Sequence, residues 1–167
     1  MGRLLVRDPG GALSWDRRHH GRVDAADFRQ IRDAVRQLVR DSVVPREEQI
    51  EDEDRIPDDL RAQAADMGLF GYALPEEHGG LGVTMTEDVQ LAFEFGYTTP
   101  AFRSLFGTNN GIAGQVIARF GSEEQQKAYL PRLAAGELIG SFALTEAEAA
   151  PTRPACAPPR DATATAG

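Results

Sequence analysis

The chain has 167 residues, of which 41% are hydrophobic, so it can fold as one domain with a buried core. Its formal net charge of -8 argues against an electrostatically driven interaction with nucleic acid. The single cysteine excludes an intrachain disulfide, and no apolar run is long enough for a signal peptide or a membrane span, so we expect a cytoplasmic protein that is not held in a membrane.

The N-terminal region, residues 1–23, shows no regular spacing of apolar residues, and we expect it to be a mobile arm. The first helix is predicted from Asp24, a good N-cap residue, because apolar residues then recur at helical spacing. Pro45 disfavours a helical conformation at the residue before it, so this helix should end near Val44. The acidic run from Glu47 to Asp54 is typical of a solvated face, and we predict no metal site in the chain.

A second helix is predicted from Pro57, which suits the first helical position, to Gly68, a natural C-cap. The segment from Gly71 to Val83 is predicted to be a loop because it contains Pro75 and several glycines. A phosphate-binding loop would need a preceding strand and a following Gly-Lys-Ser/Thr, and both are missing. We therefore predict a tight structural turn.

Two apolar helices are predicted next. The capping-box pattern Thr84-x-x-Glu87 opens a helix through about Gly96, and its all-round apolarity predicts burial on more than one side. A long helix should then run from Pro100 to Phe120. Its predicted core residues are Phe102, Leu105, Phe106, Ile112, Ala113, Val116, Ile117 and Phe120.

The middle of that long helix contains the polar sequence Thr108-Asn109-Asn110-Gly111, whose residues are poor helix formers. This sequence predicts a polar break in the helix or a wall that faces a ligand. A close helix–helix contact made by small residues is the alternative.

The pattern Ser122-x-x-Gln125 is a second capping box and opens the last helix. Residues 138–145 are predicted to be extended and would begin a following sheet. Together these elements predict an all-α fold, a helical bundle of about five to six helices that spans residues 24–146. Residues 147–167 are rich in Ala, Pro and Thr, and we expect a disordered tail.

Several stretches resemble the N-terminal helical domain of acyl-CoA dehydrogenases when they are taken in order. They are Gly68-Leu69-Phe70-Gly71 with Pro75 to Gly82, then Gly121 to Lys127, then Tyr129 to Glu137, and finally Phe142 to Glu146. Each stretch is modest alone, but their order and spacing are specific, and the similarity covers about residues 28 to 149.

The resemblance implies a three-domain enzyme that binds FAD, forms homo-oligomers and passes electrons to an electron-transfer flavoprotein. The implied reaction is α,β-dehydrogenation of an acyl-CoA thioester, in which a carboxylate removes the α-proton and the flavin accepts a hydride. The residues that it places at the flavin are Phe142, Leu144, Thr145 and Glu146. The residues that it places near the acyl chain are Phe95, Arg103 and Thr108, with plain helical core as the alternative for the aromatic side chain.

The match to the family motif Phe/Tyr-x-x-Thr-Glu-Pro-x-Ala-Gly-Ser-Asp stops after Ala149. If one G is missing from the coding DNA, the shifted codons from Ala150 to Gly167 can still spell Ser-Asp and continue as a family-like sequence. We therefore expect a frameshift after Ala149, with a natural divergent tail as the alternative. An extra G in the genomic DNA across the codons for Glu148 to Pro151 would establish the frameshift.

In most members of the family, the catalytic base that removes the α-proton lies in the C-terminal domain. We therefore assign no catalytic residue in this chain and expect it to be inactive alone. A non-enzymatic helical interaction module and a pseudogene product are the alternatives. Within flavin chemistry, the sequence leaves acyl-CoA oxidase and flavin monooxygenase open, as well as the length and branching of the acyl chain.

Overall fold

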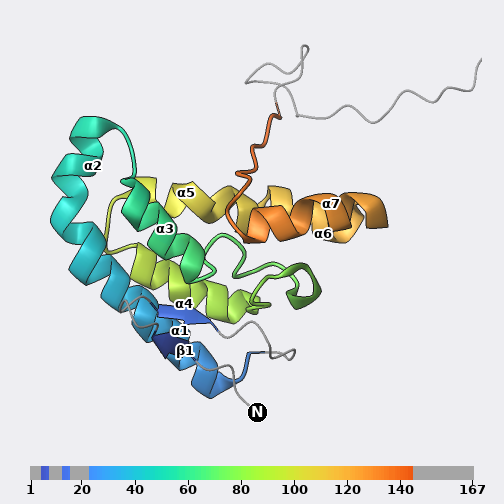
Figure 1. Cartoon of the computed structure of the whole chain (residues 1–167), viewed down its shortest axis with the longest axis horizontal. Helices are drawn as coiled ribbons and strands as arrows, with labels where there is room; N and C mark the ends of the chain where they lie inside the picture. The colour runs from blue at the N-terminus through green and yellow to red at the C-terminus, as the bar shows by residue number, and fades with distance from the viewer. Residues whose placement is uncertain (1–4, 8–12, 16–22, 145–167) are drawn as a thin grey trace, which may run out of the picture.

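The computed structural model describes residues 5–7, 13–15 and 23–144, and it describes side chains from residue 23 onward. This part of the chain is helical, so the predicted fold class is confirmed. The α-helices are α1 (Ala25–Leu38), α2 (Glu47–Glu53), α3 (Asp58–Asp66), α4 (Met85–Phe95), α5 (Pro100–Gly111), α6 (Ala113–Phe120) and α7 (Glu123–Ala134). Figure 1 shows α5, α6 and α7 along one side of the molecule and α1 and α4 along the other.

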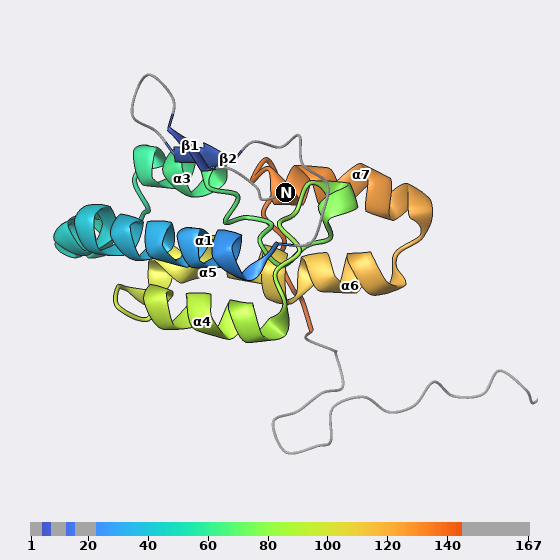
Figure 2. The ribbon, with the colours of Figure 1, turned by 90° about the horizontal axis from the view of Figure 1, so that it is seen from below.

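Two short strands lie in the region predicted to be an arm. β1 (Leu5–Arg7) pairs antiparallel with β2 (Leu13–Trp15), and Leu5 lies opposite Trp15. β2 lies against α3 (Figure 2). Strands of three residues are too short to show an alternating pattern, which is why the sequence did not predict them. The mobility of residues 1–23 stays a prediction.

The first helix does not stop at Pro45, so the predicted end near Val44 is wrong. The α-helical part ends at Leu38, and a π-helical turn (Val39–Val43) and a 3-10 turn (Val44–Arg46) lead directly into α2. Pro45 lies at the start of the 3-10 turn. A backbone N–H at this position would have no partner within the turn, so proline is tolerated there. At the other end, the Asp24 carboxylate accepts hydrogen bonds from two backbone amides of the first turn, as predicted for an N-cap.

An aromatic cluster occupies the centre of the bundle. The ring of Phe106 on α5 lies 5.1 Å from that of Phe95 on α4 and 5.5 Å from that of Phe102. The rings of Phe70 and Tyr72, from the loop after α3, lie 6.0 Å and 6.3 Å from Phe106. All five side chains are buried, so this cluster joins α4, α5 and the loop into one core.

Two predictions of burial are wrong. On α4, Val89 and Phe93 are exposed, the latter at 72%, so this helix buries one side only. On α6, Val116 and Phe120 are exposed, the latter at 82%, and Ile112 before it is exposed too. Helical spacing identifies an apolar stripe, but it does not say whether another element covers that stripe.

The glycine-containing loop before α4 is a structural turn, as predicted. The backbone N–H of Val83 donates to the carbonyl of Tyr72 at 3.0 Å, which closes the loop. A Cβ at Gly80 would lie 2.0 Å from the carbonyl oxygen of Leu74, so only glycine fits there. The chain then enters α4 through the predicted capping box of Thr84 and Glu87.

The predicted helix over residues 100–120 is divided into α5 and α6. The break lies at Ile112, whose φ of -125° and ψ of -81° are not helical. The sequence left a polar break, a ligand-facing wall and a close helix–helix contact open at residues 108–111, and the structure has a break directly after them. The capping box of Ser122 and Gln125 then opens α7, as predicted.

Candidate functional site

The junction of α5 and α6 meets the segment that follows α7. Asn109, the residue of α5 that makes this contact, is fully buried. Its Nδ2 donates to the carbonyls of Leu133 at 3.1 Å and Leu138 at 2.9 Å, and its Oδ1 accepts from the backbone N–H of Gly140 at 2.7 Å. In both views this segment leaves α7 and passes the junction before it leaves the bundle (Figures 1 and 2).

The neighbouring residue Asn110 binds the opposite side of the junction. Its Nδ2 donates to the carbonyl of Leu69 at 2.7 Å, and its Oδ1 accepts from the backbone N–H of Ala73 at 2.9 Å. Gln115 on α6 donates to the carbonyl of Ala73 at 2.8 Å. The polar sequence therefore satisfies buried backbone groups of two different segments, a role that the sequence alone did not reveal.

The residues after Gly140 carry the part of the predicted flavin site that the structure describes. Phe142 is 55% exposed and Leu144 is 60% exposed, although both are large and apolar. The backbone N–H groups of residues 141–144 donate to no other described residue. Thr145 and Glu146, the remaining predicted flavin residues, lie outside the described residues. The segment thus offers, at one place, apolar side chains and backbone donors that have no partner among the described residues.

The three predicted substrate residues lie in different environments. Phe95 is buried in the aromatic core, as the plain-core alternative expected. Arg103 is exposed on α5, and its guanidinium lies along the helix beside Gly107. Thr108 is half-buried, and its methyl group lies close to Gly140. The structure therefore brings Thr108 to the segment with Phe142 and Leu144, and the substrate role of all three residues stays a prediction.

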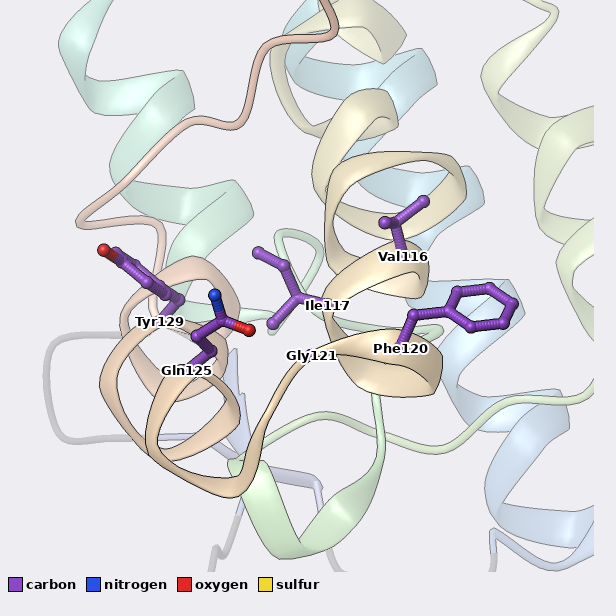
Figure 3. A pocket seen from close by; sticks show the side chains of 6 residues that line it. All are labelled: Val116, Ile117, Phe120, Gly121, Gln125 and Tyr129. Carbon is purple, nitrogen blue, oxygen red and sulfur yellow. The ribbon is translucent and has the colours of Figure 1, made fainter. Parts of the chain in front are cut away.

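A pocket of about 350 Å³ lies between α6 and α7. Figure 3 shows Ile117 pointing between the two helices towards Gln125 and Tyr129, while Phe120 points away from them. The remaining lining residues are Val116 and Gly121. None of these residues was assigned to a site from the sequence, because the apolar ones were predicted to be core.

Two carboxylates of α4 bind other parts of the described core. The buried carboxylate of Glu94 on α4 accepts two hydrogen bonds from Arg36 on α1, and the guanidinium lowers its pKa. Burial raises the pKa of the Tyr72 hydroxyl, and the nearby Asp88 carboxylate, which accepts its hydrogen bond at 2.8 Å, raises it further.

Among the described residues, no group of three His, Cys, Asp or Glu side chains is arranged to hold a metal ion. No helix within the described ranges has the length and apolarity needed to cross a membrane.

The chain belongs to the acyl-CoA dehydrogenase family. The family model for the acyl-CoA dehydrogenase N-terminal domain matches residues 25–137, which is more than half of the chain. The resemblance inferred from the sequence motifs is therefore confirmed. The matched region contains α1 to α7, so the helical bundle is the domain that defines the membership.

Similar proteins include enzymes of known type. An acyl-CoA dehydrogenase of Bacillus subtilis is 32% identical over 116 residues, which are 70% of this chain and 31% of that protein. The acryloyl-CoA reductase (NADH) of Anaerotignum propionicum is 36% identical over 71% of this chain and 30% of its own length. The crystal structure of an acyl-CoA dehydrogenase from Bacillus anthracis complexed with FAD is 32% identical with a TM-score of 0.64, and covers 76% of this chain and 22% of that one. The chain therefore spans less than a third of the length of these relatives.

Proposed function

We propose that the chain forms the N-terminal helical wall of a site for FAD and an acyl-CoA thioester in an FAD-dependent acyl-CoA dehydrogenase. The observation that supports this most is the exposed segment of residues 141–144, which follows Gly140, where the backbone is hydrogen-bonded to Asn109 of the family-matched bundle. The proposal includes α,β-dehydrogenation as the reaction, a homo-oligomeric enzyme and an electron-transfer flavoprotein as the electron acceptor.

The chemistry of this segment fits a flavin. A flavin ring has a flat apolar surface and carbonyl and nitrogen acceptors along one edge. The side chains of Phe142 and Leu144 would cover apolar surface of the ring, and the unpaired N–H groups of residues 141–144 would donate to its acceptors. Thr145 and Glu146 continue the same segment and are proposed to contact the flavin as well.

The bound flavin would supply the hydride acceptor, and the residues of this chain would orient the reactants and exclude water. Phe142 and Leu144 would remove water from the ring. Arg103 and Thr108 are proposed to face the acyl-CoA, and Thr108 is half-buried beside the segment. Phe95 would contribute only through the core that supports α5.

We propose no base in this chain. A base in a dry pocket needs a carboxyl group whose pKa lies near the working pH. The buried carboxyl of Glu94 has the opposite property, because its ion pair with Arg36 lowers its pKa. We therefore expect the isolated chain to show no dehydrogenation.

The proposal can be tested with a chimera in which residues 24–146 replace the matching region of the B. subtilis acyl-CoA dehydrogenase, a relative that is 32% identical. We expect the purified chimera to show flavin absorbance that an acyl-CoA bleaches. In the chimera, Phe142→Ala should weaken FAD binding roughly tenfold, because an apolar side chain that covers the ring is lost.

Two controls make the result specific. Phe120→Ala removes an aromatic side chain that is exposed on α6, and it should leave FAD binding unchanged. The isolated 167-residue chain should show neither stoichiometric flavin nor bleaching by an acyl-CoA. A folded, assembled chimera that contains no flavin would contradict the proposal, and an active isolated chain would contradict the absence of a base.

A non-enzymatic interaction module is the second candidate. The observation that favours it is the group of exposed apolar side chains on α4 and α6, which includes Phe93 and Phe120. Under this alternative, the chimera would fold but would not bind FAD.

A further inference from the structure

We propose that Asn109 is a positioning residue that anchors residues 138–140 to α5 and so sets where Phe142 and Leu144 leave the helical bundle. This role rests on the proposed function, because the proposed function places the side chains of Phe142 and Leu144 against the flavin ring. The contacts that support it lie entirely within the described residues.

One side chain here satisfies three backbone groups at once. Its amide group donates to the carbonyls of Leu133, at the end of α7, and Leu138, and its oxygen accepts from Gly140. These bonds span both ends of the turn that follows α7. A carboxamide is needed because it combines two donors and an acceptor in one plane, while aspartate lacks the donors and leucine lacks both.

The approach of the segment to α6 makes the anchor specific. A Cβ at Gly140 would lie 2.6 Å from the Cβ of Ala113 and 3.4 Å from Oδ1 of Asn109. Glycine therefore allows the backbone to come close enough for its N–H to reach Asn109. A shift by one residue would place Ser141 at this point, where its side chain would collide with α6.

The anchor acts at short range on the proposed flavin residues. Phe142 follows Gly140 by two residues, so at about 3.3–3.6 Å per residue it lies at most about 7 Å along the chain from the anchor. Because only one residue lies between Gly140 and Phe142, the position of Gly140 at Asn109 also sets where Phe142 and Leu144 leave the bundle.

Asn110 provides a matched control within the same helix. It is also a buried asparagine, and it also bonds backbone groups, but these belong to Leu69 and Ala73 in the loop before α4. Replacing either asparagine by alanine leaves buried backbone groups unpaired and reduces stability. Only replacement of Asn109 should release the segment of residues 138–140.

The first test is hydrogen exchange of the Gly140 amide in the full 167-residue chain. We expect Asn109→Ala to speed this exchange roughly tenfold, since the amide loses its acceptor. Asn110→Ala should leave the Gly140 amide protected at temperatures well below its Tm. Equal exchange in the wild type and Asn109→Ala, or equal release by Asn110→Ala, would overturn the anchor.

The second test measures position directly. In a chain with Cys156→Ser, spin labels are attached after Phe142→Cys and Tyr129→Cys, two exposed positions on the segment and on α7. The distribution of distances between the two spin labels should be narrow when Asn109 is present, both in the otherwise unchanged chain and in the Asn110→Ala variant. It should be broad in the Asn109→Ala variant. An unchanged distribution in folded Asn109→Ala would overturn the positioning role.

If Asn109→Ala does not fold, Gly140→Ala takes its place, because its added methyl group displaces the same backbone while the core stays intact. It should also release the Gly140 amide and broaden the distribution, and a narrow distribution would overturn the proposal. Neither test requires a flavin. A chimera that fails to bind FAD would therefore refute the proposed function without affecting these results.

Discussion

At the scale of single residues, the ion pair of Arg36 and Glu94 connects α1 to α4. Nη2 of Arg36 lies 2.6 Å from Oε1 of Glu94, and the Glu94 side chain is only 8% exposed. The hydrogen bond and charge of Arg36 hold the pKa of this carboxyl below its ordinary value. A carboxyl of this kind stabilises the fold above its ordinary pKa, and the contribution is lost as the pH falls through the folded-state value.

We expect Glu94→Gln to lower the Tm at neutral pH and to make the Tm less sensitive to acid. Glutamine keeps the size of the side chain but has no carboxylate to be protonated. Circular dichroism melting curves from neutral pH to below the ordinary range of a glutamate would measure both effects.

Glu123→Gln is the matched control for this prediction. Glu123 pairs with Lys127 at 3.2 Å, but both side chains are exposed, so the substitution should change neither the Tm nor its pH dependence measurably. Identical acid profiles for the two variants would show that the pair of Arg36 and Glu94 does not stabilise the fold.

At the scale of elements, the junction of α5 and α6 depends on close backbone packing. A Cβ at Gly114 would lie 2.0 Å from the carbonyl oxygen of Asn109 and 2.6 Å from Cδ2 of Leu74. A backbone oxygen cannot move away without opening the junction. We expect Gly114→Ala to reduce the free energy of unfolding by about 1–3 kcal/mol, measured by urea denaturation.

Gly111→Ala tests the same junction without a collision, since an added Cβ at Gly111 meets no atom within 4 Å. It should be neutral or slightly stabilising, because alanine favours the helical conformation more than glycine does. Wild-type stability of Gly114→Ala would mean that the junction adapts and that the glycine is not required.

At the scale of the whole molecule, large apolar side chains remain uncovered on α4 and α6. Phe93 and Phe120 are 72% and 82% exposed. Exposed apolar groups of this kind mark an interaction surface or promote aggregation. We expect Phe93→Ser and Phe120→Ser to reduce concentration-dependent self-association, measured by sedimentation velocity, with little change in the Tm.

A substitution in the core separates surface effects from stability. Phe106→Ala removes the centre of the aromatic cluster and should lower the free energy of unfolding by about 3–5 kcal/mol. If the two surface variants also lost stability on this scale, or if they associated as strongly as the wild type, these side chains would not form an exposed association surface.

Local patterns in the sequence were enough to predict the helical class, the N-cap at Asp24, the two capping boxes at Thr84 and Ser122, and the glycine turn before α4. These features depend on residues a few positions apart, so the order of residue types is sufficient to predict them. The order and spacing of the motifs also identified the family.

Which apolar side chains are covered became clear from the three-dimensional arrangement of the helices, as the exposure of Phe93 and Phe120 shows. The same arrangement showed that helical turns lead from α1 past Pro45 into α2 and that Asn109 binds the segment after α7. The physical reason is that burial and the pairing of backbone groups depend on which elements meet in space. Asn109 and Gly140 are 31 positions apart, and no local pattern connects them.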